Sequence, residues 1–138
     1  MIISIDLPGG RFGGGYAEWR KPFYESFAIH KQKIHLVREN SHAPATFNMV
    51  KKILEGCKLD FLFIDGDHTY NGVKSDFEMY SRLVGGGGII ALHDIVPSPP
   101  ENVGGVPRFW DEIKHCFNYT ELVKEQEQGG YGIAVIFA

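Results

Sequence analysis

Ionisable residues follow two apolar runs in the second half of the sequence. The run LDFLFI, residues 59–64, leads into Asp65-Gly66-Asp67-His68, and the run GIIAL, residues 88–92, leads into His93-Asp94. Short continuous apolar runs are typical of strands that are buried on both faces of a parallel sheet. The carboxyl ends of such strands line the ligand crevice of an open sheet. We therefore expect these acids and imidazoles to meet in one site.

The rest of the chain reads as alternating strands and helices that position this site. Strands are expected at 2–6, 34–38, 60–65 and 88–92, a weak strand at 119–123 and an interior strand at 131–137. Helices are expected at 16–29, from Pro44 to Gly56, at 71–83 ending in the glycines 85–88, and from Pro107. Trp19, Phe23 and Phe27 on the first helix, and Trp110 on the last, are predicted core residues. This alternation predicts one α/β domain over residues 1–138.

Composition excludes several classes of partner. The net charge is −3, with 14 basic and 17 acidic residues, which gives no reason to expect nucleic acid or an anionic membrane. We find no apolar run of the roughly 20 residues that a membrane span needs, and no signal sequence. Cys57 and Cys116 have no disulfide or zinc-site spacing and are expected as buried or half-buried thiols. A cytoplasmic protein that acts on a small molecule is the expectation.

Residues 60–80, DFLFIDGDHTYNGVKSDFEMY, followed by a glycine turn and IIALHD, strongly resemble the class I S-adenosylmethionine-dependent methyltransferases. The small-molecule O-methyltransferase and cephalosporin hydroxylase-like members are the most similar. The resemblance extends over nearly all of the chain. It implies a Rossmann-like α/β fold with a mostly parallel sheet and helices on both faces.

The resemblance also implies roles for individual residues. Asp6 stands where an acid binds the ribose hydroxyls of S-adenosylmethionine, and Asn40 with Ser41 stands at a turn that contacts the adenine. Metal-dependent relatives end two strands in Asp-x-x-Lys and Asp-Asn, where this chain has Asp65-Gly66-Asp67-His68 and His93-Asp94. His68 takes the position of the general base, and an imidazole suits proton abstraction near neutral pH.

A divalent cation would lower the pKa of an acceptor hydroxyl and hold it in line with the sulfonium methyl group. Asp65, His93 and Asp94 are the candidate ligands, and their oxygen-rich chemistry favours Mg²⁺ or Mn²⁺. Simpler roles stay open: the acids can cap the following helices, and His93 can be a hydrogen-bonded structural residue. His68 can be a helix-start residue, and Asp67 is expected most often as a loop acid or cap.

One departure from the family concerns the start of the chain. The family's first strand and its Glu/Asp-x-Gly-x-x-x-Gly turn have no counterpart, and the glycine-rich residues 9–15 do not replace them, so we expect them as a loop or lid. The chain therefore reads as truncated before a central strand. Either the strands ending at Asp6 and Asp65 pair directly, or another copy fills the space. Because an exposed edge invites association, a homo-oligomer is expected.

The leading hypothesis is S-adenosylmethionine-dependent O-methylation of a small hydroxylated molecule with the help of a divalent cation. Two alternatives stay open. The first is a catalytically inactive remnant of the fold that acts as a binding or assembly module. The second is a metal-dependent hydrolase or hydroxylase-like protein that uses Asp65, His93 and Asp94 without a methyl donor.

Overall fold

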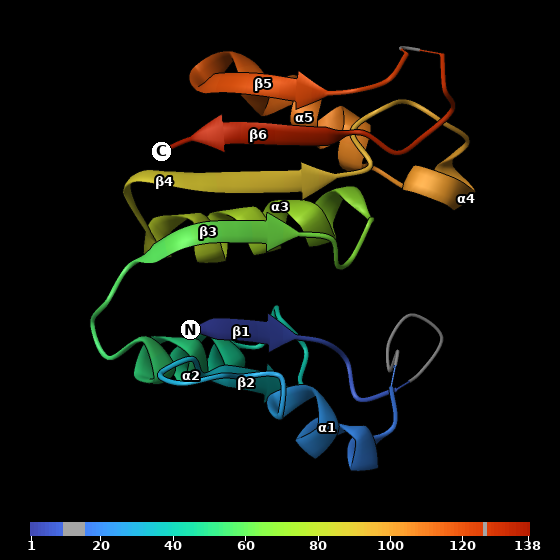
Figure 1. Cartoon of the computed structure of the whole chain (residues 1–138). Helices are drawn as coiled ribbons and strands as arrows, with labels where there is room; N and C mark the ends of the chain where they lie inside the picture. Colours follow the sequence, from blue (N-terminus) through green and yellow to red (C-terminus); the bar gives the residue numbers. More distant parts are fainter. Residues whose placement is uncertain (10–15, 126) are drawn as a thin grey trace. The chain divides into compact units, whose positions relative to one another are not determined.

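The chain divides into two compact units in a computed structural model that describes residues 1–9, 16–125 and 127–138. The N-terminal unit is Met1–Gly56 and the C-terminal unit is Cys57–Ala138 (Figure 1). Most of the predicted loop or lid at 9–15 lies outside the described residues. The single domain over 1–138 stays a prediction. Among the described residues, no helix is long and apolar enough to cross a membrane.

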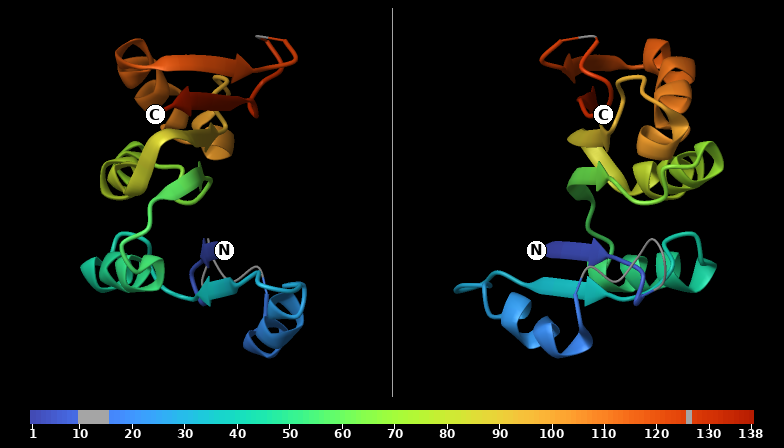
Figure 2. Two further views of the ribbon diagram at one scale, coloured as in Figure 1. Left: turned by 60° about the vertical axis from the view of Figure 1, so that its left-hand side comes forward. Right: turned by 90° about the vertical axis from the view of Figure 1, so that its right-hand side faces the viewer.

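Two parallel strands organise the N-terminal unit. Strand β1 (Ile2–Ile5) pairs with β2 (Ile34–Val37) over their whole length. Helix α2 (Pro44–Leu54) begins with a proline in its first turn, where the missing N–H costs no hydrogen bond, and it ends where Glu55 turns left-handed at φ 51°. The short 3₁₀ helix η1 (Glu18–Arg20) and helix α1 (Lys21–Glu25) lie on the other side of this strand pair from α2 (Figure 2).

The helix predicted at 16–29 is present but shorter, and the prediction that Trp19 belongs to the core was wrong. Only residues 18–25 are helical, and the aromatic stripe is exposed, with exposed fractions of 74% for Trp19, 58% for Phe23 and 59% for Phe27. Phe23 and Phe27 pack against each other, with ring centroids 4.9 Å apart. Spacing makes side chains share a face of a helix, but burial also needs a surface that covers that face.

The C-terminal unit is a four-stranded sheet in the order β3-β4-β6-β5 (Figure 1). Strand β3 (Leu59–Ile64) runs parallel to β4 (Val84–His93), whereas β6 (Ile133–Phe137) is antiparallel to both β4 and β5 (Asn118–Leu122). The predicted interior position of the last strand is confirmed. Together with the parallel pair of the N-terminal unit, this confirms an α/β fold.

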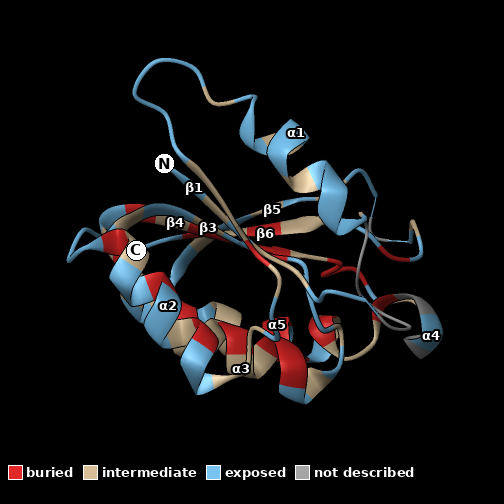
Figure 3. Cartoon of the chain, turned by 90° about the horizontal axis from the view of Figure 1, so that it is seen from below, coloured by how far each residue is buried: buried red, intermediate tan, exposed pale blue. Residues whose placement is uncertain are grey.

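Helices pack on one face of this sheet. Helix α3 (Tyr70–Tyr80) continues into the 3₁₀ helix η2 (Ser81–Leu83), and α5 (Val106–Ile113), which follows the short α4 (Pro100–Val103), continues into η3 (Lys114–Cys116). Helices α3 and α5 lie on the same side of the strands and carry buried turns (Figures 2 and 3). Trp110 is 2% exposed, Leu92 and Ile136 are fully buried, and all three belong to the core between helices and sheet.

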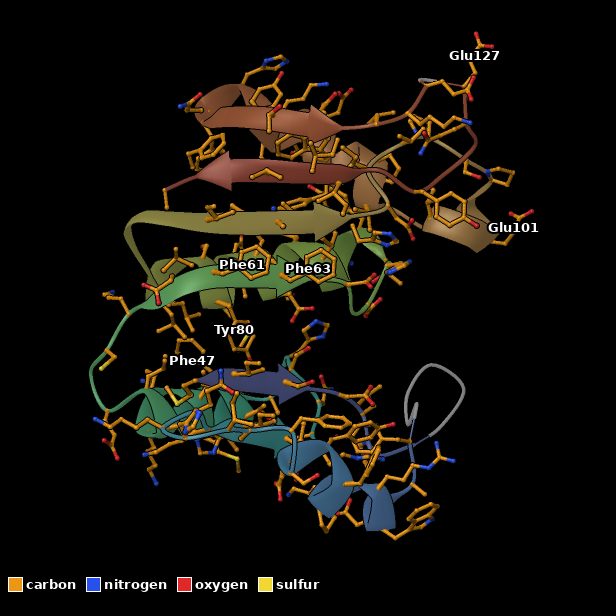
Figure 4. All side chains as sticks on the ribbon, viewed as in Figure 1. Phe47, Phe61, Phe63, Tyr80, Glu101 and Glu127 are labelled. Atoms are coloured by element: carbon orange, nitrogen blue, oxygen red, sulfur yellow. The ribbon has the colours of Figure 1, made fainter. Side chains whose placement is uncertain are left out.

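Three further predictions about this unit were wrong. Strand β3 is not buried on both faces, because Phe61 and Phe63 are 57% and 44% exposed; Figure 4 shows both rings on the side of β3 away from α3. The glycines 85–88 do not end a helix but lie within β4, where the pairing with β3 shifts between Leu59 and Phe61. Both cysteines are exposed.

The described strands form one two-stranded and one four-stranded sheet, each within its own unit. Direct pairing of the strands that end at Asp6 and Asp65 stays a prediction. The alternative, a second copy, stays a prediction.

Candidate active site

Two neighbouring strand ends carry the predicted site residues of the C-terminal unit. Asp65 directly follows β3, and His93 and Asp94 end and follow β4. The strands are parallel, with Ile64 opposite Leu92, so their carboxyl ends lie side by side. The predicted meeting of Asp65 with Asp94 therefore occurs, although their chemical roles stay predictions.

Two acids and two imidazoles form one compact cluster there. His68 Nε2 lies 3.2 Å from Asp65 Oδ1 in a hydrogen bond, and His68 Nδ1 lies 3.3 Å from Asp94 Oδ2. His93 Nδ1 lies 3.2 Å from Asp65 Oδ1 and 3.3 Å from Asp94 Oδ1. Each carboxylate therefore faces both imidazoles.

The two acids differ in burial and support. The Asp94 side chain is 10% exposed, whereas that of Asp65 is 43% exposed. Asp94 has a φ of 61°, a left-handed conformation that aspartate tolerates better than most residues. Its Oδ1 accepts the Tyr131 N–H at 3.1 Å, and its own N–H donates to the Gly132 carbonyl at 3.0 Å. Asp94 is therefore buried and held by the backbone of residues 131 and 132, whereas Asp65 is the more exposed acid.

The loop that carries His68 is ordered by helix capping. The Thr69 hydroxyl accepts the Gly72 N–H at 3.0 Å and caps α3, and Asp67 Oδ1 accepts the Thr69 N–H at 2.9 Å. Asp67 thus acts as a loop acid that holds the cap residue Thr69. These two side-chain hydrogen bonds, from residues on either side of His68, hold its backbone where the ring reaches both strand ends.

Two glycines that the sequence analysis missed hold the other side of the His68 backbone. The His68 carbonyl accepts the Gly105 N–H at 2.7 Å. A Cβ at Gly104 would lie 2.1 Å from the same carbonyl oxygen, and one at Gly105 would lie 2.5 Å from the Tyr70 nitrogen. Only glycine allows such close approach. The adjacent pair after a proline-rich loop was the signal in the sequence, but its partner lies far along the chain.

The predicted cation ligands do not form a metal site as they are arranged. Among residues 1–9, 16–125 and 127–138, no three His, Cys, Asp or Glu side chains are placed so that they could hold one metal ion. Asp65, His93 and Asp94 supply a suitable set of donor types, but both carboxylates face imidazoles.

The residues predicted to hold S-adenosylmethionine lie in the N-terminal unit. Asp6 follows β1, where its N–H donates to the Val37 carbonyl at 3.0 Å, and Asn40 lies a short turn beyond β2. The Asn40 side chain is used locally, since its Oδ1 accepts the His42 N–H at 2.9 Å, and Ser41 stands between them. The Asp6 carboxylate makes no hydrogen bond or ion pair to another described residue, and its two oxygens are the acceptors that a diol needs.

Arg38 is a second feature of this unit that the sequence analysis missed. Its side chain is 9% exposed, and its guanidinium donates to the carbonyls of Pro8 and Tyr16, each at 2.7 Å. The guanidinium also lies 4.2 Å from the centroid of the Tyr16 ring. Arg38 therefore joins Pro8, two residues beyond Asp6, to Tyr16.

Comparison with known proteins finds a relative that matches part of this chain. A protein of Acanthamoeba polyphaga mimivirus, named only as uncharacterized, is 37% identical over 68 residues, which are 49% of this chain and 30% of that protein. The chain thus spans less than a third of that relative's length.

Two solved structures share the fold. An O-methyltransferase from Bacillus cereus in complex with SAH superposes with a TM-score of 0.60 at 20% identity, over 99% of this chain and 73% of that one. TomG, an O-methyltransferase of tomaymycin synthesis from Streptomyces achromogenes in complex with SAM, gives 0.61 at 18% identity, over 99% and 60%. A family model described as a methyltransferase domain matches residues 2–95, which is more than half of the chain. The chain therefore belongs to this methyltransferase domain family.

Proposed function

We propose that this chain takes part in S-adenosylmethionine-dependent O-methylation of a small hydroxylated molecule, with His68 as the general base and Asp94 as the residue that positions it. One observation carries the proposal: in a chain of the methyltransferase family, the His68 ring is held between a buried and an exposed carboxylate at two adjacent strand ends. The co-substrate would supply an electrophilic methyl group on its sulfonium sulfur.

The proposed proton transfer follows from the different exposure of the two acids. The acceptor hydroxyl takes the place of the exposed Asp65 oxygen at His68 Nε2, while buried Asp94 keeps its place at Nδ1. The hydroxyl proton moves to Nε2 as the oxygen forms its bond to the methyl carbon and the carbon–sulfur bond breaks. The resulting imidazolium lies next to the Asp94 carboxylate at Nδ1, so the positive charge is stabilised where it forms.

Residues of the N-terminal unit are proposed to bind the nucleoside end of the co-substrate. Asp6 would accept hydrogen bonds from the two ribose hydroxyls, and Asn40 with Ser41 would contact the adenine. The place of Asp6 at a strand end, where its carboxylate has no hydrogen bond or ion pair to another described residue, supports this assignment. The cation at Asp65, His93 and Asp94 stays a prediction, and activity that is unchanged by EDTA would contradict it.

The first experiment measures co-substrate binding by titration calorimetry with S-adenosylhomocysteine. We expect a Kd below the millimolar range for the natural chain and at least tenfold weaker binding for Asp6→Ala. The matched control is Asp60→Ala, which removes an exposed carboxylate of β3 and should bind like the natural chain. A Kd no tighter than millimolar for the natural chain would leave the enzymatic function without support.

The second experiment separates the two acids by methyl transfer from labelled S-adenosylmethionine to a panel of hydroxylated acceptors. General-base catalysis contributes about 10²–10⁴-fold, so we expect a loss of that size for His68→Ala. Asp94→Asn keeps an oxygen for the Tyr131 N–H but presents an amide to His68, and we expect a loss of about 10²-fold or more. Asp65→Asn should lose less than tenfold. Equal losses in the two acid variants would refute the assigned roles.

A further inference from the structure

The segment Gly129–Gly132 between β5 and β6 has a left-handed backbone throughout. The φ angles of its four residues are 72°, 108°, 61° and 79°. Three of the four residues are glycine, which adopts such angles freely, and the remaining one is Tyr131. A residue with a Cβ is strained in this conformation, so Tyr131 occupies a position that the backbone alone would assign to glycine.

Hydrogen bonds on both sides keep Tyr131 in this conformation. Its N–H donates to Asp94 Oδ1 at 3.1 Å, and its carbonyl accepts the Val96 N–H at 3.0 Å. The Gln128 side chain donates to the Gly130 carbonyl at 2.8 Å and so holds the start of the segment. All of these bonds use the backbone of residues 130–131, and a glycine at position 131 would make the same bonds without strain.

Packing also fails to account for a tyrosine at this position. A Cβ at Gly132 would lie 2.8 Å from Val96 Cγ2, and one at Gly130 would lie 3.2 Å from Val103 Cγ1, so close packing explains these two glycines. Tyr131 is 67% exposed. Its side chain is therefore presented to solvent from a strained backbone that is bonded directly to Asp94.

We propose that Tyr131 is a specificity residue whose ring forms a wall of the acceptor site. Strained residues that are kept where an easier residue would serve cluster at ligand sites. An exposed phenol ring binds a flat apolar surface, so the acceptor is a ring compound: either an aromatic ring or the C–H face of a sugar, with the reacting hydroxyl on the ring. The proposal rests on the proposed function, because it takes the His68 and Asp94 cluster as the place of reaction.

The test uses two probes, catechol and a methyl glucoside, whose binding to the chain with bound S-adenosylhomocysteine is measured by saturation-transfer NMR. We expect at least one probe to bind the natural chain, with affinity at least tenfold lower in Tyr131→Gly and retained in Tyr131→Phe. The control Phe61→Ala, which removes another exposed ring, should bind the probe like the natural chain. In turnover, KM for the acceptor should rise in Tyr131→Gly while kcat changes little.

Folding and co-substrate binding are measured on the same proteins. Tyr131→Gly removes the strain, so its denaturation midpoint should equal or exceed that of the natural chain, and its Kd for S-adenosylhomocysteine should not change. The proposal is overturned if neither probe binds the natural chain, or if the glycine variant binds as tightly. Failure of the proposed function is a different result: S-adenosylhomocysteine does not bind, or His68→Ala leaves methyl transfer unchanged.

Discussion

Replacing Gly104 by alanine tests how the fold holds His68. The new Cβ would lie 2.1 Å from the His68 carbonyl oxygen, so the two backbone segments must separate and the bond from the Gly105 N–H at 2.7 Å is lost. The left-handed φ of 60° costs alanine about 1 kcal/mol, the lost hydrogen bond about 1 kcal/mol, and the forced displacement about 1–3 kcal/mol. We expect the free energy of unfolding to fall by about 3–5 kcal/mol in total.

The matched control is Gly129→Ala. Gly129 has a similar φ of 72°, but no heavy atom lies within 4 Å of the position that its new Cβ would take, so only the backbone strain of about 1 kcal/mol remains. Urea unfolding followed by tryptophan fluorescence measures both variants, since Trp110 is buried in the same unit. With an m value of about 2 kcal/mol per M, the midpoint of Gly104→Ala should lie about 1–2 M below that of the control. Equal midpoints would refute the role assigned to the contact with His68.

Three further predictions concern the stability of the C-terminal unit. Burial, helped by the negative charge of Asp76, raises the pKa of Tyr80 to about 12. The neutral phenol therefore stabilises the folded state fully below pH 10, and this contribution is lost as the pH rises towards 12. Over that pH range, urea titrations should show that the free energy of unfolding of the natural chain falls by at most about 2–3 kcal/mol and that of Tyr80→Phe falls by less. Parallel pH profiles of the two proteins would contradict this. Trp110→Phe removes the hydrogen bond from Trp110 Nε1 to Glu121 Oε1 at 2.7 Å and should lower the free energy of unfolding by about 1–3 kcal/mol. Thermal unfolding measures this, and an unchanged Tm would count against the prediction. Leu92→Ala leaves a cavity at a fully buried position and should cost about 2–5 kcal/mol in urea unfolding, and a cost below 1 kcal/mol would show that the core collapses around it.

Local signals in the sequence predicted the elements whose boundaries depend on nearby residues. Helix α2 begins at Pro44 and ends before Gly56, because both residues act on the backbone at their own positions. The acids after β3 and β4 were recognised as a shared site because consecutive parallel strands end at the same edge. Burial was predicted less well: Trp19 and Phe61 lie in apolar patterns but are exposed, since burial depends on what packs over a face.

Residue patterns alone were enough to predict the α/β alternation, the convergence of Asp65 with His93 and Asp94, and the methyltransferase family. How that site is held became visible only in the folded chain. Tyr131 binds Asp94 across 37 residues of sequence, and Gly105 binds the carbonyl of His68. No pattern in neighbouring residues reports such contacts, because they depend on which segments the fold brings together rather than on the conformation that each segment prefers.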